Sequence, residues 1–274
     1  MARPLPVAMR QGAFAALLAA VPAVSCTAHE TWLMPQGFVQ PAGATVDLTL
    51  TSGMHFPRLD APIRPERVAN AVARTENGEV ALTIRPATAH ALHLVSPQLP
   101  AGDAAFGVRL HPRSIELTDA QVEEYFAEIA ASTPVRAAWA KVQGRTRWKE
   151  IYIKHARSCT FADHPSATER CRERLGLPLE LIPLRRLSSL TVGDRVRFRL
   201  LWQGKALAGI PVGWMDESSS KRHFSVSDSN GDVEFSPGAA GKALLYAVYL
   251  RPGADGTPWM SDFTTQTFEV RAPR

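Results

Sequence analysis

The chain has 274 residues, 45% of them hydrophobic, which is enough for one or two domains with packed cores. Its 31 basic and 26 acidic residues give a formal net charge of +5, which falls by two to +3 without Arg3 and Arg10 of the first 28 residues. A positive excess this small, scattered along the chain, argues against a nucleic-acid-binding protein.

Residues 1–28 have the features of a secretory signal peptide. Two arginines precede an apolar core at 14–24, and small residues stand at positions −3 and −1 of a cut after Ala28. The apolar core is too short to span a bilayer comfortably, and no later segment reaches transmembrane length. We therefore expect a periplasmic or secreted mature protein that begins at His29 and has no transmembrane helix.

A second way to process the signal stays open. Residues 23–26, Ala-Val-Ser-Cys, form a weak lipobox, so Cys26 could be lipidated and His29 would then be internal. Either route leaves Cys159 and Cys171 as an even pair in an oxidising compartment. The pair therefore predicts a disulfide but separates the two routes only weakly.

The first part of the mature chain is predicted to be a β-sandwich of the immunoglobulin-like type, because short alternating segments are separated by turn residues. Asn77-Gly78 is the expected hairpin turn, and residues 52–57 form a loop that carries His55. The expected strands are 31–38, 45–51, 67–75, 79–85, 91–96 and 105–110.

A short helical insertion follows, opening within residues 117–126. Thr118 is a favourable N-cap and Gln121 stands at N3, which completes a capping-box pattern. Apolar residues then fall on one face, as in an amphipathic helix. Ser132 and Pro134 are expected to end this helix.

The next segments are a strand and a polar loop. Residues 148–156 alternate as a strand, and residues 159–175 are expected to form a loop with a helical turn at 168–175. A bridge between Cys159 and Cys171 closes a short loop, for which the chain-entropy argument gives about 3 kcal/mol of stabilisation.

After a proline-interrupted linker at 177–187, a second small sandwich is expected, with a tight turn at 228–231. The fold class is therefore mainly β, with two sandwich units, residues 29–183 and 184–274, and the helical insertion in the first. The expected strands of the second unit are 195–202, 210–215, 223–226, 233–235, 243–250 and 265–270.

The chain resembles a known family through segments spread over nearly all of its mature length. It is similar to the domain of unknown function 4198 family, periplasmic proteins often labelled as a component of cobalt or nickel transport. The segments that carry the resemblance are AHETWLMP (28–35), GMHFP (53–57), WKEIYIKHA (148–156), LGLPLELIP (175–183), GKALAGIPV (204–212) and SDSNGDV (227–233).

The resemblance implies a periplasmic protein whose last unit is a transthyretin-like or carboxypeptidase-regulatory-like sandwich. It implies fold and compartment better than activity. The family's middle segment usually reads acidic-x-Tyr-x-basic-x-Ala-Lys, and Glu150, Tyr152 and Lys154 match it. Arg157 stands where lysine is common, so the positive charge is kept.

His29 and His55 are the candidate metal ligands. A mature chain that begins at His29 offers a free α-amine beside the ring Nδ1, and together these nitrogens can chelate one ion. His55 can add a third nitrogen from its loop. Three nitrogens suit Cu best and then Ni or Co. The spacing of the two histidines is no metal motif in itself, so this hypothesis depends on where the signal is cut.

Other residues are weaker candidates. Met34 and Met54 lie close in sequence to the two histidines and could be soft ligands, although such methionines more often fill a core. Glu30 could orient an imidazole from the second shell of the metal or face solvent. The last candidates are three alternating residues on one face of a predicted strand, Glu150, Tyr152 and Lys154. They could line a polar pocket or form a ladder of side chains on the surface.

The sequence lacks a glycine-rich phosphate loop, a nucleophile elbow, a His-Glu-x-x-His pattern and paired catalytic carboxylates. The main hypothesis is therefore a non-enzymatic exported metal-binding protein, with Cu, Ni or Co as its metal, which passes the ion to a membrane transporter. One alternative is an envelope interaction module without metal. A third hypothesis, with less support, is a copper oxidase that uses an N-terminal histidine clamp.

Overall fold

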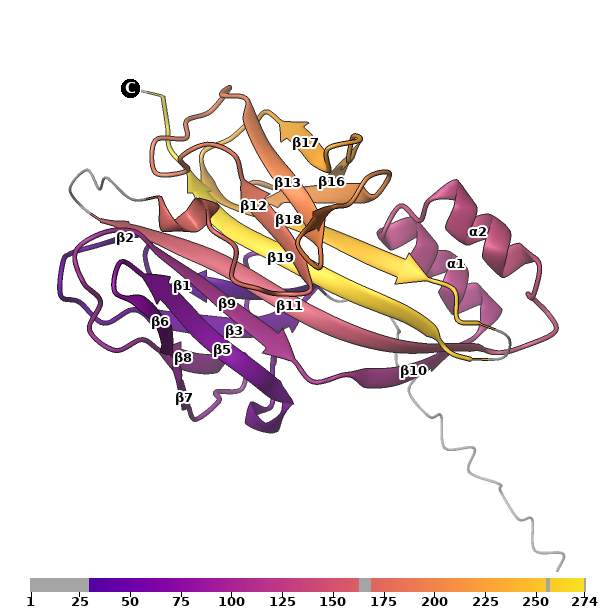
Figure 1. The fold of residues 1–274 in the computed structure, drawn as a ribbon. Helices are drawn as coiled ribbons and strands as arrows, with labels where there is room; N and C mark the ends of the chain where they lie inside the picture. Colours follow the sequence, from indigo (N-terminus) through magenta and orange to yellow (C-terminus); the bar gives the residue numbers. More distant parts are fainter. Residues whose placement is uncertain (1–29, 163–168, 255–256, 274) are drawn as a thin grey trace, which may run out of the picture.

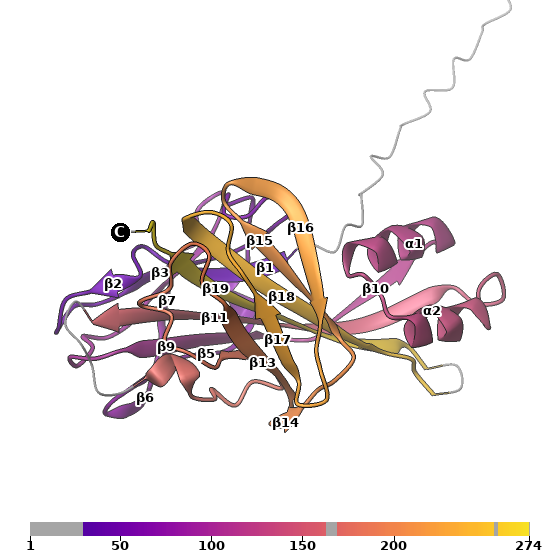
Figure 2. The same cartoon turned by 90° about the horizontal axis from the view of Figure 1, so that it is seen from above.

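A computed structural model of the chain describes residues 30–162, 169–254 and 257–273. The fold is mainly β, as predicted, with three sheets and two α-helices in these ranges. In Figure 1 the long strands β11 and β19 run through the middle of the molecule, with one smaller sheet below them and another above. The helices lie at one end of the long strands, an arrangement also seen from above in Figure 2.

The largest sheet has ten strands, and β11 and β19 pair in parallel at its centre, from Glu150 opposite Trp259 to Arg157 opposite Gln266. It contains strands from both sides of the expected boundary at residue 183. Its main path runs β16-β15-β18-β19-β11-β9-β5-β6, and β10 and β2 pair with β11 beside this path. The strands are β2 (Val39–Gln40), β5 (Val68–Thr75), β6 (Gly78–Ala81), β9 (Ala104–Leu110), β10 (Arg113–Leu117), β11 (Trp148–Ala162), β15 (Pro211–Asp216), β16 (Ser219–Val226), β18 (Gly241–Arg251) and β19 (Trp259–Val270).

The five-stranded sheet packs against the half of the large sheet that contains β5 and β9. Buried and less buried side chains alternate at the start of β3, as predicted. Leu48 and Leu50 are buried and share a core with Phe106 and Val108. The expected strand at 79–85 instead divides at the buried residue Leu82, so its two parts belong to different sheets. The strands are β1 (Glu30–Pro35), β3 (Asp47–Gly53), β4 (Ala61–Pro62), β7 (Thr83–Arg85) and β8 (Leu92–Val95).

The four-stranded sheet covers the other half, where Phe198 of β13 packs on Phe268 of β19. The prediction of a linker at 177–187 is wrong, because this segment contains a fully buried strand. Its prolines flank that strand or end it, where a missing N–H is tolerated. The strands are β12 (Leu179–Pro183), β13 (Val196–Trp202), β14 (Lys205–Ala206) and β17 (Asp232–Phe235).

The helical insertion has two helices rather than one. α1 (Asp119–Glu128) begins as predicted, because Thr118 and Gln121 form a capping box through both backbone N–H groups. Ser132, expected to end it, is the N-cap of α2 (Thr133–Ala140), whose proline occupies the first turn, where proline is tolerated. Within the described ranges, neither helix is long and apolar enough to cross a membrane.

An aromatic core holds the helices on the end of the large sheet. The rings of Trp148 and Trp259 stack with centroids 4.4 Å apart, and Trp139 of α2 meets Trp148 edge-on at 5.2 Å. Phe126 and Tyr125 of α1 complete this core. Residue 148 opens β11, so the helices cover the start of the strand that links both halves of the sheet.

The predicted disulfide between Cys159 and Cys171 is confirmed, with Cα atoms 5.8 Å apart. Cys159 was expected in a loop, but it lies within β11, which continues to Ala162 because β9 and β2 pair with its second half. Cys171 belongs to a short 3₁₀ helix, η2 (Arg170–Arg172). Another such helix, η1 (Pro65–Arg67), precedes β5.

Replacing both cysteines with alanine is expected to lower the free energy of unfolding by about 3 kcal/mol, because the unfolded chain then regains the freedom that the bridge removes. Urea denaturation of the oxidised protein and of the double variant measures the difference. Wild-type protein treated with a reductant is the control and should approach the variant. A loss below about 0.5 kcal/mol would show that the bridge adds little.

Candidate functional site

The candidate metal ligands are His29 and His55, of which the structure describes only His55. His29 lies outside the described residues. His55 is exposed in the loop that follows β3. In the β1–β3 ladder, Glu30 pairs with Gly53, two residues before His55. The start of β1 and the loop of His55 therefore lie at the same end of the five-stranded sheet.

Several contacts fix the loop of His55. The ring of Phe56 packs edge-on against Trp32, with centroids 5.6 Å apart. The carboxylate of Asp60 accepts a hydrogen bond from the N–H of Met54 at 3.4 Å and pairs with Arg58 at 2.9 Å. The imidazole is thus presented on a loop anchored at both of its ends.

Glu30, the first residue of β1, is buried, and this burial raises its pKa to about 7. Arg222 of β16 lies 3.7 Å from its carboxylate and opposes the shift, as does Lys154. Arg222 also stacks over the ring of Tyr246 at 5.4 Å. Glu30 therefore faces a guanidinium in the interior and not the solvent.

The two methionines lie in different surroundings. Met34 is buried in the core that also contains Trp32. Met54 is half-buried and directly precedes His55. In residues 30–162, 169–254 and 257–273, no group of three or more His, Cys, Asp or Glu side chains is placed to hold a metal ion.

Glu150, Tyr152 and Lys154 share one face of β11 but have different environments. Glu150 is buried and accepts hydrogen bonds from Tyr125 Oη at 3.1 Å, from Trp148 Nε1 at 2.9 Å, and from the hydroxyl of Ser261. Burial raises the pKa of this carboxyl group above its ordinary value. Tyr152 and Lys154 line a pocket farther along the strand.

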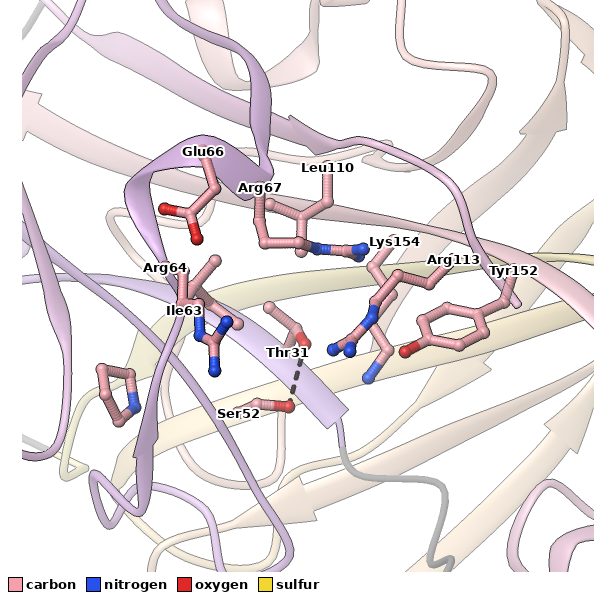
Figure 3. Close-up of a pocket in the computed structure, with 11 residues that line it drawn as sticks. Thr31, Ser52, Ile63, Arg64, Glu66, Arg67, Leu110, Arg113, Tyr152 and Lys154 are labelled. Atoms are coloured by element: carbon pink, nitrogen blue, oxygen red, sulfur yellow. Dashed lines mark hydrogen bonds between the residues drawn. The ribbon is translucent and has the colours of Figure 1, made fainter. Parts of the chain in front are cut away.

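The pocket has a volume of about 310 Å³ and is shown in Figure 3. Four basic side chains line it, and Glu66 is its single acidic one. Its floor includes Thr31 and Ser52, whose hydroxyl oxygens lie 3.1 Å apart. The basic residues are Arg64, Arg67, Arg113 and Lys154. We call this pocket the cationic pocket.

The three arginines of the cationic pocket were not among the sequence-based candidates. They lie beside β4, in η1 and in β10, so no spacing in the sequence connects them. The match of Tyr152 and Lys154 to a known family segment was the one signal that pointed to this surface. Arg113 meets these residues because β10 pairs with β11, where Arg113 lies opposite Tyr152.

The profile of a family described as "Domain of unknown function (DUF4198)" matches residues 26–251. No curated protein matches the chain significantly. Similar solved structures include two fibronectin type-III domains of chicken tenascin, with 10% identity, a TM-score of 0.21 and coverage of 86% of this chain and 98% of that one.

Murine CEACAM1b has 9% identity, a TM-score of 0.22 and coverage of 89% and 100% of the two chains. The adhesin InvE of Yersinia pseudotuberculosis has 11% identity, a TM-score of 0.23 and coverage of 86% and 58%. At TM-scores this low, these structures carry no inference about function.

Proposed function

Because this chain belongs to the DUF4198 family, whose description names no activity, we propose from its residues that it is an exported, non-enzymatic metal-binding protein. It takes up one Cu, Ni or Co ion at the start of its mature chain and passes it to a membrane transporter. The observation that best supports this proposal is the pairing of Glu30 with Gly53, which places the loop of His55 beside the first described residue of the chain.

The ligands follow from this register. A cut after Ala28 gives His29 a free α-amine and a ring nitrogen on one residue, which is covalently bonded to Glu30. Glu30, the residue to which His29 is bonded, lies at the same end of the ladder as the loop of His55. Three nitrogens from two residues then form a set that favours Cu over Ni and Co.

The candidates nearby have other roles in this proposal. Met34 is left out of the ligand set because its side chain is in the core. Met54 stays beside His55 as a soft ligand available to reduced copper. Glu30 faces Arg222 and therefore anchors the start of β1 instead of binding the ion.

Replacing His29 with alanine in the exported protein is expected to weaken Cu(II) binding at least tenfold, because the chelate ring loses its imidazole. His55→Ala should weaken binding less, since it removes one nitrogen and leaves the chelate. Isothermal titration with Cu(II), Ni(II) and Co(II) measures both effects, after intact mass has established the first residue of the mature chain.

His111→Ala is the matched control, because His111 is exposed outside the proposed site and its loss should leave affinity unchanged. Acetylation of the mature amino terminus should reproduce the loss seen with His29→Ala. Unchanged affinity in both the His29 and the His55 variant would refute this ligand set. A mature chain that begins elsewhere, for example at a lipidated Cys26, would also refute it.

One observation favours the alternative of an envelope interaction module. Strand β16 is at the edge of the large sheet, and Phe224 and Val226 on it are exposed, at 38% and 60%. Exposed apolar side chains on an edge strand are typical of surfaces that pair with a partner. A mature protein that begins at His29 but binds none of the three metals would leave this alternative as the better proposal.

A further inference from the structure

We propose that the cationic pocket binds a small polyanion that carries two or more phosphate or carboxylate groups. This site is separate from the metal ligands and does not rest on the metal proposal. The four basic side chains come from three parts of the chain and point into one space (Figure 3).

The fold brings these cations together by backbone pairing. The N–H of His111 donates to the carbonyl of Arg67 at 2.8 Å, which ties η1 to the start of β10. Arg113 of β10 then lies opposite Tyr152 in the ladder with β11, two residues before Lys154. The positions of Arg67, Arg113 and Lys154 are therefore set by the regular structure.

The charges of the three arginines in the pocket are not balanced by carboxylates around them. Within the described part of the chain, Arg64, Arg67 and Arg113 have no carboxylate partner within 4.0 Å, and Glu66 is the lone acid of the lining. Burial lowers the pKa of Arg67, and the nearby charge of Arg113 lowers it further. Like charges that converge in this way are stabilised when an anion lies between them.

The rest of the lining suits an organic anion. The hydroxyl group of Tyr152 can hydrogen-bond to an oxyanion, while Leu110 and Ile63 give an apolar wall. Lys154 is held in place over the rings of Tyr152 and Phe263, at 5.7 and 5.3 Å from their centroids. A volume of about 310 Å³ fits a small molecule and not a folded partner.

Arginine is well suited to this task, because its planar fork can donate two hydrogen bonds to one carboxylate or phosphate. Three such forks can hold at least two anionic groups at once. A single monovalent anion would leave most of the positive charge unbalanced, so multivalent ligands should bind more tightly.

Pyrophosphate, citrate and inorganic phosphate are the probes for this proposal. Calorimetric titration of the full mature protein at low salt is expected to show saturable binding of pyrophosphate, citrate or both, tighter than that of inorganic phosphate. Affinity should fall as salt is added. Preference for pyrophosphate or for citrate identifies the phosphate or the carboxylate as the natural group.

Arg113→Gln and Arg67→Gln are each expected to weaken binding of the preferred probe at least tenfold. The matched control is Arg195→Gln, which removes an equal charge from a side chain that is 79% exposed and outside the pocket. It should change affinity by less than twofold. Arg113 is exposed, and thermal melting of each variant checks that the fold is kept.

Two results would overturn the proposal. One is the absence of saturable binding of all three probes at millimolar concentration. The other is an equal loss of affinity in Arg195→Gln and Arg113→Gln, which would mean that net charge alone attracts the anion.

Discussion

Replacing Arg157 with alanine is expected to lower the free energy of unfolding by about 3–5 kcal/mol. Arg157 is fully buried, and its guanidinium donates to the carboxylate of Glu180 at 3.3 Å. It also donates to the backbone carbonyls of Cys171 and Glu173, both at 2.6 Å. Alanine would leave a buried carboxylate and two carbonyls without this donor.

The same contacts explain why lysine is not an equal substitute at this position. Burial lowers the pKa of Arg157 to about 10, so it remains charged at neutral pH. One arginine fork reaches three acceptors on β12 and on the segment after β11, whereas an ammonium group matches this geometry poorly. Arg157→Lys should therefore cost less than alanine but still reduce stability measurably.

Guanidinium chloride denaturation of these variants tests the argument. Arg195→Ala serves as the control, because its ion pair with Glu234 is exposed and should contribute less than about 1 kcal/mol. The double variant Arg157→Met with Glu180→Leu should recover part of the loss, since it removes both buried charges together but still leaves the two carbonyls without this donor. A loss below about 1 kcal/mol for Arg157→Ala would contradict the role assigned to this residue.

Glu150→Ala is expected to have a comparable effect, about 3–5 kcal/mol, because three buried donors lose their shared acceptor. The donors are the hydroxyls of Tyr125 and Ser261 and the indole N–H of Trp148. These groups join α1, β11 and β19, so the helices should loosen from the sheet. Loss of the near-ultraviolet circular dichroism signal of the surrounding tryptophans would report this.

Glu150→Gln is the matched control, since it keeps an acceptor oxygen in nearly the same shape. It also reveals a pH effect. Burial raises the pKa of Glu150 above its ordinary value of 4.5, so the folded state holds the proton more tightly than the unfolded state does. Wild-type stability should fall as pH rises from 4.5 through the folded-state pKa, and this component should be missing in Glu150→Gln. Parallel stability curves for the two proteins from pH 4.5 to 8 would contradict it.

Local features of the chain were predictable because neighbouring residues decide them. The alternation that buries Leu48 and Leu50, the capping box at Thr118 and the pairing of Cys159 with Cys171 all follow from short-range pattern or from a count. The second helix and β12 are not predicted from the sequence, because proline usually ends or interrupts regular structure, whereas here the prolines open a helix and border a strand.

The β-rich fold class, the family and the disulfide can be predicted from the sequence alone, because strand periodicity, characteristic segments and the number of cysteines are local or countable properties of the chain. Three other features become visible only in the folded chain: β11 pairs in parallel with β19, Glu150 is buried against Tyr125 of α1, and Arg67 and Arg113 line one pocket with Lys154. Such pairings depend on which surfaces bury one another after long loops close, and no local pattern encodes that choice.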